Sequence, residues 1–320
     1  MKYLSMIIAF MFVFILTAVG TYILSFVLNY FGKRGMIGNL YPNVRGGIPR
    51  AVGIVPAIVL CFFLLPGYND LVLIMGICAL IDDIMGRKKI QSLGIEWGQL
   101  SRGIGIILVM IVGLLEGLGI SSIFIALLVQ PINIADMQPG SASMVTMIMS
   151  IVTVIFMFIA GSPNVSELPA NYTPLLLFVV CLAYSPLDFA GKIMMGEVGN
   201  HSFAIALGIS FYLVGGIWWL LLLEIITVCL TAFVRRSTLR VFFRQKLGLM
   251  DPTFGDFFMD VLTGGGLGDL CRKHILKDKQ YDVTHPVLIE FGFRRLLYNP
   301  YATHHKSFSP RKPQEMKLGR

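Results

Sequence analysis

The stretch ALIDDIMGRKK, residues 79–89, places two adjacent carboxylates at the end of an apolar run and three cations directly after them. Apolar runs of this kind recur along the whole first part of the chain. A soluble domain would carry about a quarter charged residues, whereas this chain of 320 residues is 56% hydrophobic and 14% charged. The composition therefore predicts a membrane protein with several spans.

We predict an all-α membrane bundle with about nine transmembrane helices. The apolar runs interpreted as spans are residues 4–28, 51–65, 71–81, 104–118, 123–135, 144–160, 174–184, 202–214 and 216–234. Several are shorter than the roughly 20 residues that a helix perpendicular to the bilayer needs, so their ends are expected to extend into flanking polar residues. The first run is long for a signal peptide and has no convincing cleavage site, which favours a retained span.

The distribution of Lys and Arg predicts the orientation of these spans. If the loop after the first span is inside, every Lys and Arg except Lys2 falls inside, as the positive-inside rule requires. Residues 1–234 would then form the transmembrane bundle with its amino terminus outside. Residues 235–320 would form a small basic cytoplasmic region, packed under the membrane or partly disordered at 307–320. The net charge of +8 is explained by these loops and needs no nucleic-acid partner.

Acidic side chains gather on the same predicted face as the cations. They lie at the inner ends of the third and fifth spans and in the loop after the seventh: Asp82 with Asp83, Asn133 with Asp136, and Asp188 with Glu197. Asn133 and Asp136 share one face of a helix because they are three residues apart, whereas adjacent Asp82 and Asp83 cannot. Clustered carboxylates repel one another unless a cation lies among them. Mg²⁺ suits such a set, since it takes oxygen ligands and often bridges to a substrate phosphate.

Simpler roles stay open for each of these residues. A carboxylate near the membrane boundary can cap a helix or pair with a neighbouring Arg87 or Lys88. Glu224 lies inside the ninth span, where a lipid-facing carboxylate would be costly. Pairing within the bundle and a functional role both remain open for that residue.

Four pieces of the chain resemble the polyprenyl-phosphate N-acetylhexosamine-1-phosphate transferase superfamily, which includes phospho-MurNAc-pentapeptide translocase and the undecaprenyl-phosphate GlcNAc-1-phosphate transferases. PNVRGGIPRAVG (42–53) resembles the family's first internal loop, and ALIDDIMGRKK resembles its double-aspartate motif. INIADMQPG (132–140) resembles its N-x-x-D-x-x-x-G motif, and DFAGKIMMGEVGNHS (188–202) resembles its M-G-D-x-G loop. The resemblance covers about residues 40–202 and implies a divergent member.

The resemblance implies a reaction between a UDP-sugar and a polyprenyl phosphate in the inner leaflet of the plasma membrane. The lipid phosphate would attack the sugar-bound phosphorus, UMP would leave, and a polyprenyl-diphosphate sugar for envelope glycan synthesis would remain. Mg²⁺, with Mn²⁺ as an alternative, would serve as cofactor. Both reactants are anionic, so metal and protein cations would have to offset their repulsion. A homodimer is an option for the assembly.

The resemblance also implies roles for individual residues. Asp82, Asp83 and Asp136 would be catalytic, and the metal ligands would be Asp82, Asp83 and Glu197. Phosphates or nucleotide would be bound by the remaining polar residues of these motifs: Asn133, Arg45, Lys88, Lys192 and Asp188.

The chain departs from the family at several of these positions. Ala79 stands in a glycine position, Gln130 replaces an asparagine, and Glu197 replaces the aspartate of the M-G-D loop. The segment after the double aspartate contains Glu96 and lacks the usual lysine, and the family's late histidine-rich loop has no counterpart. Two alternatives therefore stay open: a non-catalytic relative that binds lipid phosphate or nucleotide-sugar, and a cation-coupled transporter. The transporter is disfavoured because its sites would lie near the membrane midplane.

Overall fold

A computed structural model of the chain describes residues 2–86, 88–90, 96–161, 168–277 and 279–299. The described residues form helices and the turns between them, without a strand, so the prediction of an all-α fold is confirmed. One isolated bridge pairs Lys89 with Glu96. The segment 307–320, predicted to be partly disordered, lies outside the described residues.

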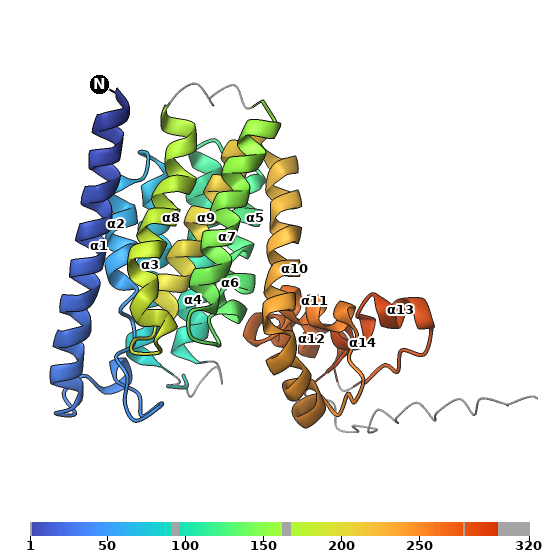
Figure 1. Ribbon diagram of the computed structural model, residues 1–320. Helices are drawn as coiled ribbons and strands as arrows, with labels where there is room; N and C mark the ends of the chain where they lie inside the picture. The colour runs from blue at the N-terminus through green and yellow to red at the C-terminus, as the bar shows by residue number, and fades with distance from the viewer. Residues whose placement is uncertain (1, 87, 91–95, 162–167, 278, 300–320) are drawn as a thin grey trace, which may run out of the picture. The chain divides into compact units, whose positions relative to one another are not determined.

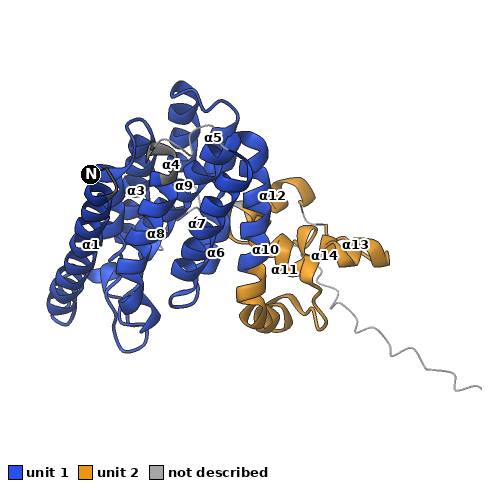
Figure 2. Ribbon diagram, turned by 45° about the horizontal axis from the view of Figure 1, so that its top comes forward, with its two compact units in different colours: residues 1–231 blue, residues 232–320 orange. Residues whose placement is uncertain are grey.

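The chain divides into two compact units, residues 1–231 and residues 232–320 (Figure 2). Helix α10 (Ile217–Phe242) contributes to both units. The predicted boundary between residues 234 and 235 therefore falls inside this helix, close to the junction of the units.

The first unit is a bundle of helices (Figure 1). Its elements up to α10 are α1 (Lys2–Gly32), η1 (Gly38–Leu40), α2 (Ile54–Phe63), α3 (Tyr68–Met85), α4 (Trp97–Leu115), α5 (Ser121–Leu127), α6 (Val129–Ala135), α7 (Ser141–Ile159), α8 (Leu168–Phe189) and α9 (Gly196–Gly215). Each of the nine predicted spans overlaps one of these helices, α10 or, for the fifth span, the pair α5 and α6.

Six helices are long and apolar enough to cross a membrane: α1, α4, α7, α8, α9 and α10. Helix α2 and the α5–α6 pair are apolar but shorter, and α3 carries Asp70, Asp82 and Asp83. The helices thus suit a lipid bilayer, while the count of nine spans stays a prediction.

The fifth predicted span is interrupted at Leu128, between α5 and α6. Pro131 explains the interruption, since it has no N–H for the carbonyl of Leu127 and its ring crowds that carbonyl. The break brings the following segment, with Asn133 and Asp136, to the end of a short helix.

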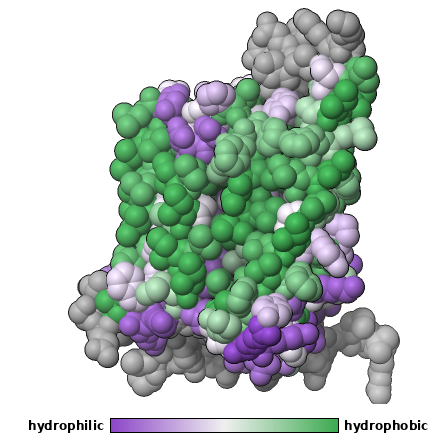
Figure 3. Space-filling model, turned by 90° about the vertical axis from the view of Figure 1, so that its left-hand side faces the viewer, coloured by the Kyte–Doolittle hydropathy of each residue, from purple (hydrophilic) through white to green (hydrophobic). Residues whose placement is uncertain are grey.

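Helix α9 is the centre of the first unit. It packs against α2, α3, α5, α6, α7 and α8, and nearly all of its side chains are buried. Helix α1 is peripheral, with large apolar side chains such as Tyr22 and Phe26 each 66% exposed. Figure 3 shows a broad apolar surface on this side of the molecule, as expected for contact with lipid tails.

With α5 and α6 taken together as one interrupted helix, successive helices of the bundle run in alternating directions (Figure 1). The loops that follow α1, α6 and α8, together with the carboxyl end of α3, lie at the same end of the unit, the lower end in Figure 1. The motifs singled out from the sequence are therefore gathered at one end of the bundle.

The described part of the second unit contains four short helices after the α10–η2 segment (η2, Phe243–Leu247): α11 (Phe254–Thr263), α12 (Gly266–Leu276), α13 (Pro286–Glu290) and α14 (Phe293–Leu296). A capping box between Thr253 and Asp256 begins α11, which satisfies free N–H groups of its first turn. Asp260 of α11 forms a buried ion pair with Arg295 of α14. Ion pairs thus join helices that are too short to be stable alone.

Candidate functional site

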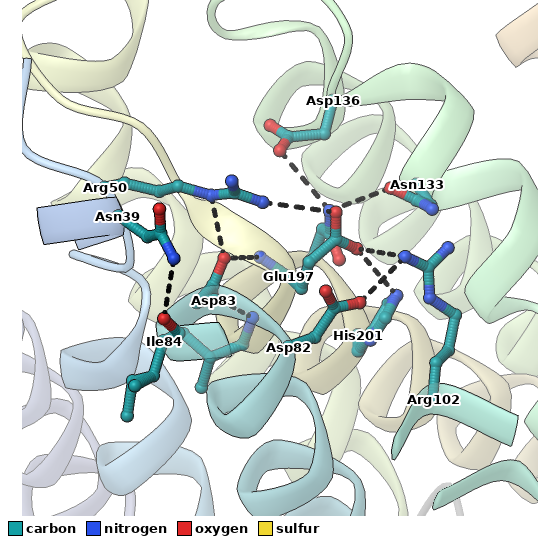
Figure 4. A network of polar contacts seen from close by, with 12 residues as sticks. Asn39, Arg50, Asp82, Asp83, Ile84, Arg102, Asn133, Asp136, Glu197 and His201 are labelled. Atoms are coloured by element: carbon teal, nitrogen blue, oxygen red, sulfur yellow. Dashed lines mark hydrogen bonds and ion pairs between the residues drawn. The ribbon is translucent and has the colours of Figure 1, made fainter. Parts of the chain in front are cut away.

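The two adjacent aspartates at the end of α3 have different partners (Figure 4). Asp83 is fully buried and accepts hydrogen bonds from the backbone N–H groups of Glu197 (to Oδ1, 3.0 Å) and Val198 (to Oδ2, 3.0 Å). These are free N–H groups in the first turn of α9. Asp83 therefore does for α9 what an N-cap side chain does, from another helix, and its negative charge also suits the positive end of the helix dipole.

The backbone around this contact requires glycine at two positions. Gly196 has φ +73°, and a Cβ there would lie 2.6 Å from Asp83 Oδ2. Gly53 lies so close to Gly199 that a Cβ on it would come within 2.5 Å of the Gly199 Cα. Two further hydrogen bonds, Gly53 N–H to the Met195 carbonyl (3.0 Å) and Met194 N–H to the Pro49 carbonyl (2.8 Å), join the loop after α1 to the loop before α9. Segments far apart in sequence are thus fixed side by side.

Two arginines converge on Glu197. Arg50 forms an ion pair with Asp83 (Nε to Oδ1, 2.9 Å) and lies 3.6 Å from Glu197. Arg102 of α4 pairs with Asp82 (2.9 Å) and lies 3.4 Å from the other oxygen of Glu197. Each arginine thus bridges one aspartate of α3 to the same glutamate of α9.

His201 is the third group beside Glu197. It lies one helical turn later on α9, is fully buried, and has Nε2 3.2 Å from Glu197 Oε2. A side chain four residues away on a helix faces the same direction. The pair therefore restricts the rotamer of Glu197 within the core.

Asn133 and Asp136 face this network from the end of α6. The amide nitrogen of Asn200 is 3.3 Å from Asp136 Oδ2 and 3.3 Å from the oxygen of Asn133. If the Asn133 side-chain amide is turned by 180°, its nitrogen donates to Glu197 Oε2 (3.3 Å) and its oxygen accepts from Arg102 (2.8 Å) instead. The sharing of one helix face predicted for Asn133 and Asp136 agrees with their common partner, Asn200.

Charge balance distinguishes Asp136 from the other carboxylates. The network holds four carboxylates, Asp82, Asp83, Asp136 and Glu197, and two guanidinium groups. Fully ionised, it carries two negative charges in excess of the arginines, and the hydrogen-bond partner of Asp136 among the described residues is the neutral amide of Asn200. A divalent cation would balance this excess, and the oxygen donors are of the kind that Mg²⁺ prefers.

The donors fit a divalent cation in kind and charge but are paired with protein cations as they stand. In the part of the chain that the structure describes, no three His, Cys, Asp or Glu side chains are grouped so as to hold a metal ion. Both oxygens of Asp83 accept hydrogen bonds from backbone N–H groups, whereas Asp82 and Glu197 are bound mainly by arginines that can exchange partners. As placed, these carboxylates do not form a cation site, and Asp82, Asp136 and Glu197 would have to draw together to hold a cation.

The remaining predicted residues lie around this network or apart from it. Asp188, near the end of α8, is buried and accepts a hydrogen bond from Ser143 of α7 (2.6 Å). Lys88, Lys192 and Arg45 are exposed. Their predicted contact with substrate phosphates is untested, and none of the three has an ion pair in the described network.

Sequence reasoning missed four members of the network: Arg50, Arg102, Asn200 and His201. Their signals were present but weak. Asn200 and His201 stand three and four residues after Glu197, the spacing of one helix face. Arg102 lies just before the predicted span 104–118, whereas α4 begins earlier, at Trp97, and includes it. Arg50 was counted only as a cation of an internal loop.

Comparisons with known proteins do not assign the chain to a family. No family model matches it, and a search of curated proteins finds no match. The case for a function therefore depends on the residues and their geometry.

Proposed function

We propose that this chain is a membrane-embedded transferase that moves a sugar-1-phosphate from a UDP-sugar to a polyprenyl phosphate and releases UMP. The observation that carries the proposal is the convergence of three separate motifs on one network. Asp82 and Asp83, Asn133 and Asp136, and Glu197 come from different helices yet share partners within 3.6 Å. Chemistry on two anionic phosphates requires such a concentration of cations and metal-binding oxygens.

In this proposal the residues of the network have three roles: binding of a metal ion, positioning of α9 and binding of phosphate. Asp82, Asp136 and Glu197 would hold Mg²⁺ or Mn²⁺ once drawn together, and the cation would supply neutralisation of the donor diphosphate and polarisation of its sugar-bearing phosphorus. Asp83 keeps the start of α9 in place. Arg50 and Arg102 exchange carboxylate oxygens for phosphate oxygens, which suits the bidentate geometry of a guanidinium group.

The reaction then needs a lipid phosphate oxygen in line with the bond to the leaving UMP. A bond forms between that oxygen and the sugar-bearing phosphorus, and the phosphoanhydride bond breaks with its electron pair passing to UMP. The lipid acceptor requires a site near the membrane boundary. The position of the network at the end of the bundle, among helices that suit a bilayer, is consistent with this requirement.

A second candidate is a non-catalytic relative that binds lipid phosphate or nucleotide-sugar. The pairing of Asp82, Asp83 and Glu197 with internal cations favours it, because a carboxylate engaged by arginine is a poorer metal ligand. The transferase is preferred because a purely structural network gives no role to Asp136, whose partner is the neutral amide of Asn200.

Transfer of radiolabel separates the two candidates. Purified protein in undecaprenyl-phosphate-containing nanodiscs is given Mg²⁺ and a panel of labelled UDP-sugars. The transferase predicts label in the lipid phase, lost with EDTA and in Asp136→Asn. Binding of the lipid without transfer from any donor would instead establish the non-catalytic relative.

A further inference from the structure

The excess of positive over negative charge lies entirely in the carboxyl-terminal part of the chain. Residues before 235 contain ten Lys and Arg and ten Asp and Glu, so the entire net charge of +8 lies in residues 235–320. The proposed transferase site in the first unit does not account for this excess, since that part of the chain is neutral overall.

Three acidic side chains of the second unit form ion pairs within it, whereas Asp251, Asp282 and Glu290 are exposed. Asp256 pairs with Arg294 (2.5 Å), Asp260 with Arg295, and Asp269 with Arg272. These pairs leave a surface on which cations predominate. Its exposed basic residues include Arg236, Arg240, Arg244, Lys246, Lys277 and Lys279.

Among the large apolar side chains that are exposed on the same unit, five belong to residues 250–254 and 287–291. They form what we call the apolar patch: Met250 (52% exposed), Phe254 (49%), Val287 (53%), Leu288 (40%) and Phe291 (64%). Isolated exposed apolar residues are ordinary on soluble surfaces, but a group of this size at one place marks an interaction site.

Backbone contacts place these side chains together. A Cβ on Gly255, next to Phe254, would lie 2.0 Å from the Glu290 carbonyl oxygen and 2.7 Å from the carbonyl carbon of Phe291. Val287 and Phe291 are four residues apart, so they face the same side of α13 and its end.

Basic residues border the patch directly. The Arg244 guanidinium donates to the Met250 carbonyl (3.1 Å), and Arg294 donates to the carbonyl of Asp251 (3.0 Å). Cations therefore lie beside the apolar side chains at the start of the patch.

We propose that the apolar patch and its basic border dock on an anionic lipid bilayer. Apolar side chains bordered by Lys and Arg are what an interfacial surface requires, since the first enter the acyl boundary and the second bind anionic headgroups. The unit continues directly from α10, a helix long and apolar enough to span a membrane, so a bilayer lies within reach of the chain. A second copy is a poorer occupant, because two such basic borders would repel.

The test places an environment-sensitive fluorophore on the patch of the full-length protein. Cys271, an exposed native cysteine, is replaced by serine, and Leu288→Cys is labelled with NBD. The matched control labels Asp282→Cys, an exposed polar position of the same unit. The labelled proteins are reconstituted into nanodiscs of phosphatidylcholine alone or with about one-third phosphatidylglycerol.

Docking predicts a blue shift and at least about a twofold gain in emission at position 288 only in the anionic nanodiscs. Emission should return to the phosphatidylcholine level in 0.5 M salt, because screening weakens headgroup attraction. An Arg244→Gln, Lys246→Gln double variant, which neutralises the cation beside Met250 and its neighbour in η2, should lose the shift. Doxyl-labelled lipid should quench position 288 and not position 282.

Three results would overturn the proposal. Equal emission in both nanodiscs would show that docking does not require anionic lipid. Emission like that of position 282 in every lipid would show that the patch does not dock on a bilayer. Energy transfer between labelled copies in one nanodisc, with no quenching by doxyl lipid, would identify a second copy as the occupant. Phe291→Cys provides a second reporter if Leu288→Cys does not fold.

Discussion

Arg102 provides the sharpest prediction at the scale of single residues. Its removal leaves Asp82 and Glu197 with uncompensated charge. Arg102→Gln should therefore lower the free energy of unfolding by about 3 kcal/mol, the low end of the range for buried pairs because the side chain is 20% exposed. Divalent cation affinity should rise at the same time, since the metal no longer competes with arginine. Thermal unfolding in detergent, with and without Mg²⁺, measures the first effect, and Mn²⁺ titration followed by EPR measures the second.

The conservative Arg102→Lys is the control, because it keeps the charge and should keep most of the stability. If Arg102→Gln unfolds at the same temperature with and without Mg²⁺, and binds Mn²⁺ no more tightly than the parent, the arginine does not compete with a cation at this site.

Substitutions of Asp83 and Asp136 should have opposite main effects, the first on the free energy of unfolding and the second on cation affinity. Asp83→Ala removes the acceptor of two N–H groups at the start of α9 and a partner of Arg50, so we expect a loss of roughly 3–5 kcal/mol. Asp136→Ala should cost much less stability but weaken Mn²⁺ binding at least about tenfold, or about 1.4 kcal/mol, because the cation would lose a charged oxygen ligand. Denaturant melts and Mn²⁺ titrations of both variants decide the matter. Equal losses of cation affinity would show that Asp83 is itself a ligand.

At the scale of elements, the junction of α3 and α9 depends on Gly196. Gly196→Ala combines a positive φ with a Cβ only 2.6 Å from Asp83 Oδ2, so unfolding should become easier by about 2–4 kcal/mol. Gly103→Ala is the matched control, because this glycine lies within α4 with nothing within 4 Å of a new Cβ. It should be neutral or stabilising by up to ~1 kcal/mol. Equal melting temperatures for the two variants would contradict the contact.

The sequence predicted the elements well and their contacts partly. Apolar runs predicted the helices because burial in lipid or core leaves a compositional signal. The break at Leu128 was not predicted, since periodicity does not register a single proline such as Pro131. Arg50 and Arg102 were missed for a different reason: an ion pair between residues far apart in sequence has no local pattern. The gathering of Asp82, Asp136 and Glu197 followed from alternating loops and did not require the partners to be known.

At the scale of the whole molecule, the predicted topology can be read by labelling. Cys271 is the one exposed cysteine among the described residues, so a membrane-impermeant maleimide should modify it first. With the carboxyl terminus inside, Cys271 should react in inverted vesicles and not in intact cells. Glu116→Cys, in a Cys271→Ser background, lies at the predicted outer end of the fourth span, where α4 ends, and should react in intact cells. Labelling of both positions from one side would contradict the nine-span orientation.

The most direct measurement for the proposed transferase is UMP release by the purified protein with undecaprenyl phosphate, a panel of UDP-sugars and Mg²⁺. The parent should release UMP with one donor in proportion to lipid-linked sugar. Asp136→Asn, with melting behaviour like the parent's, should be slower by about 100-fold or more, as expected for loss of a group that acts directly on the reacting phosphates. Equal rates in parent and variant would contradict a reaction at this site. If no donor yields UMP, the transferase is contradicted and the non-catalytic relative, which binds lipid phosphate or nucleotide-sugar, is favoured instead.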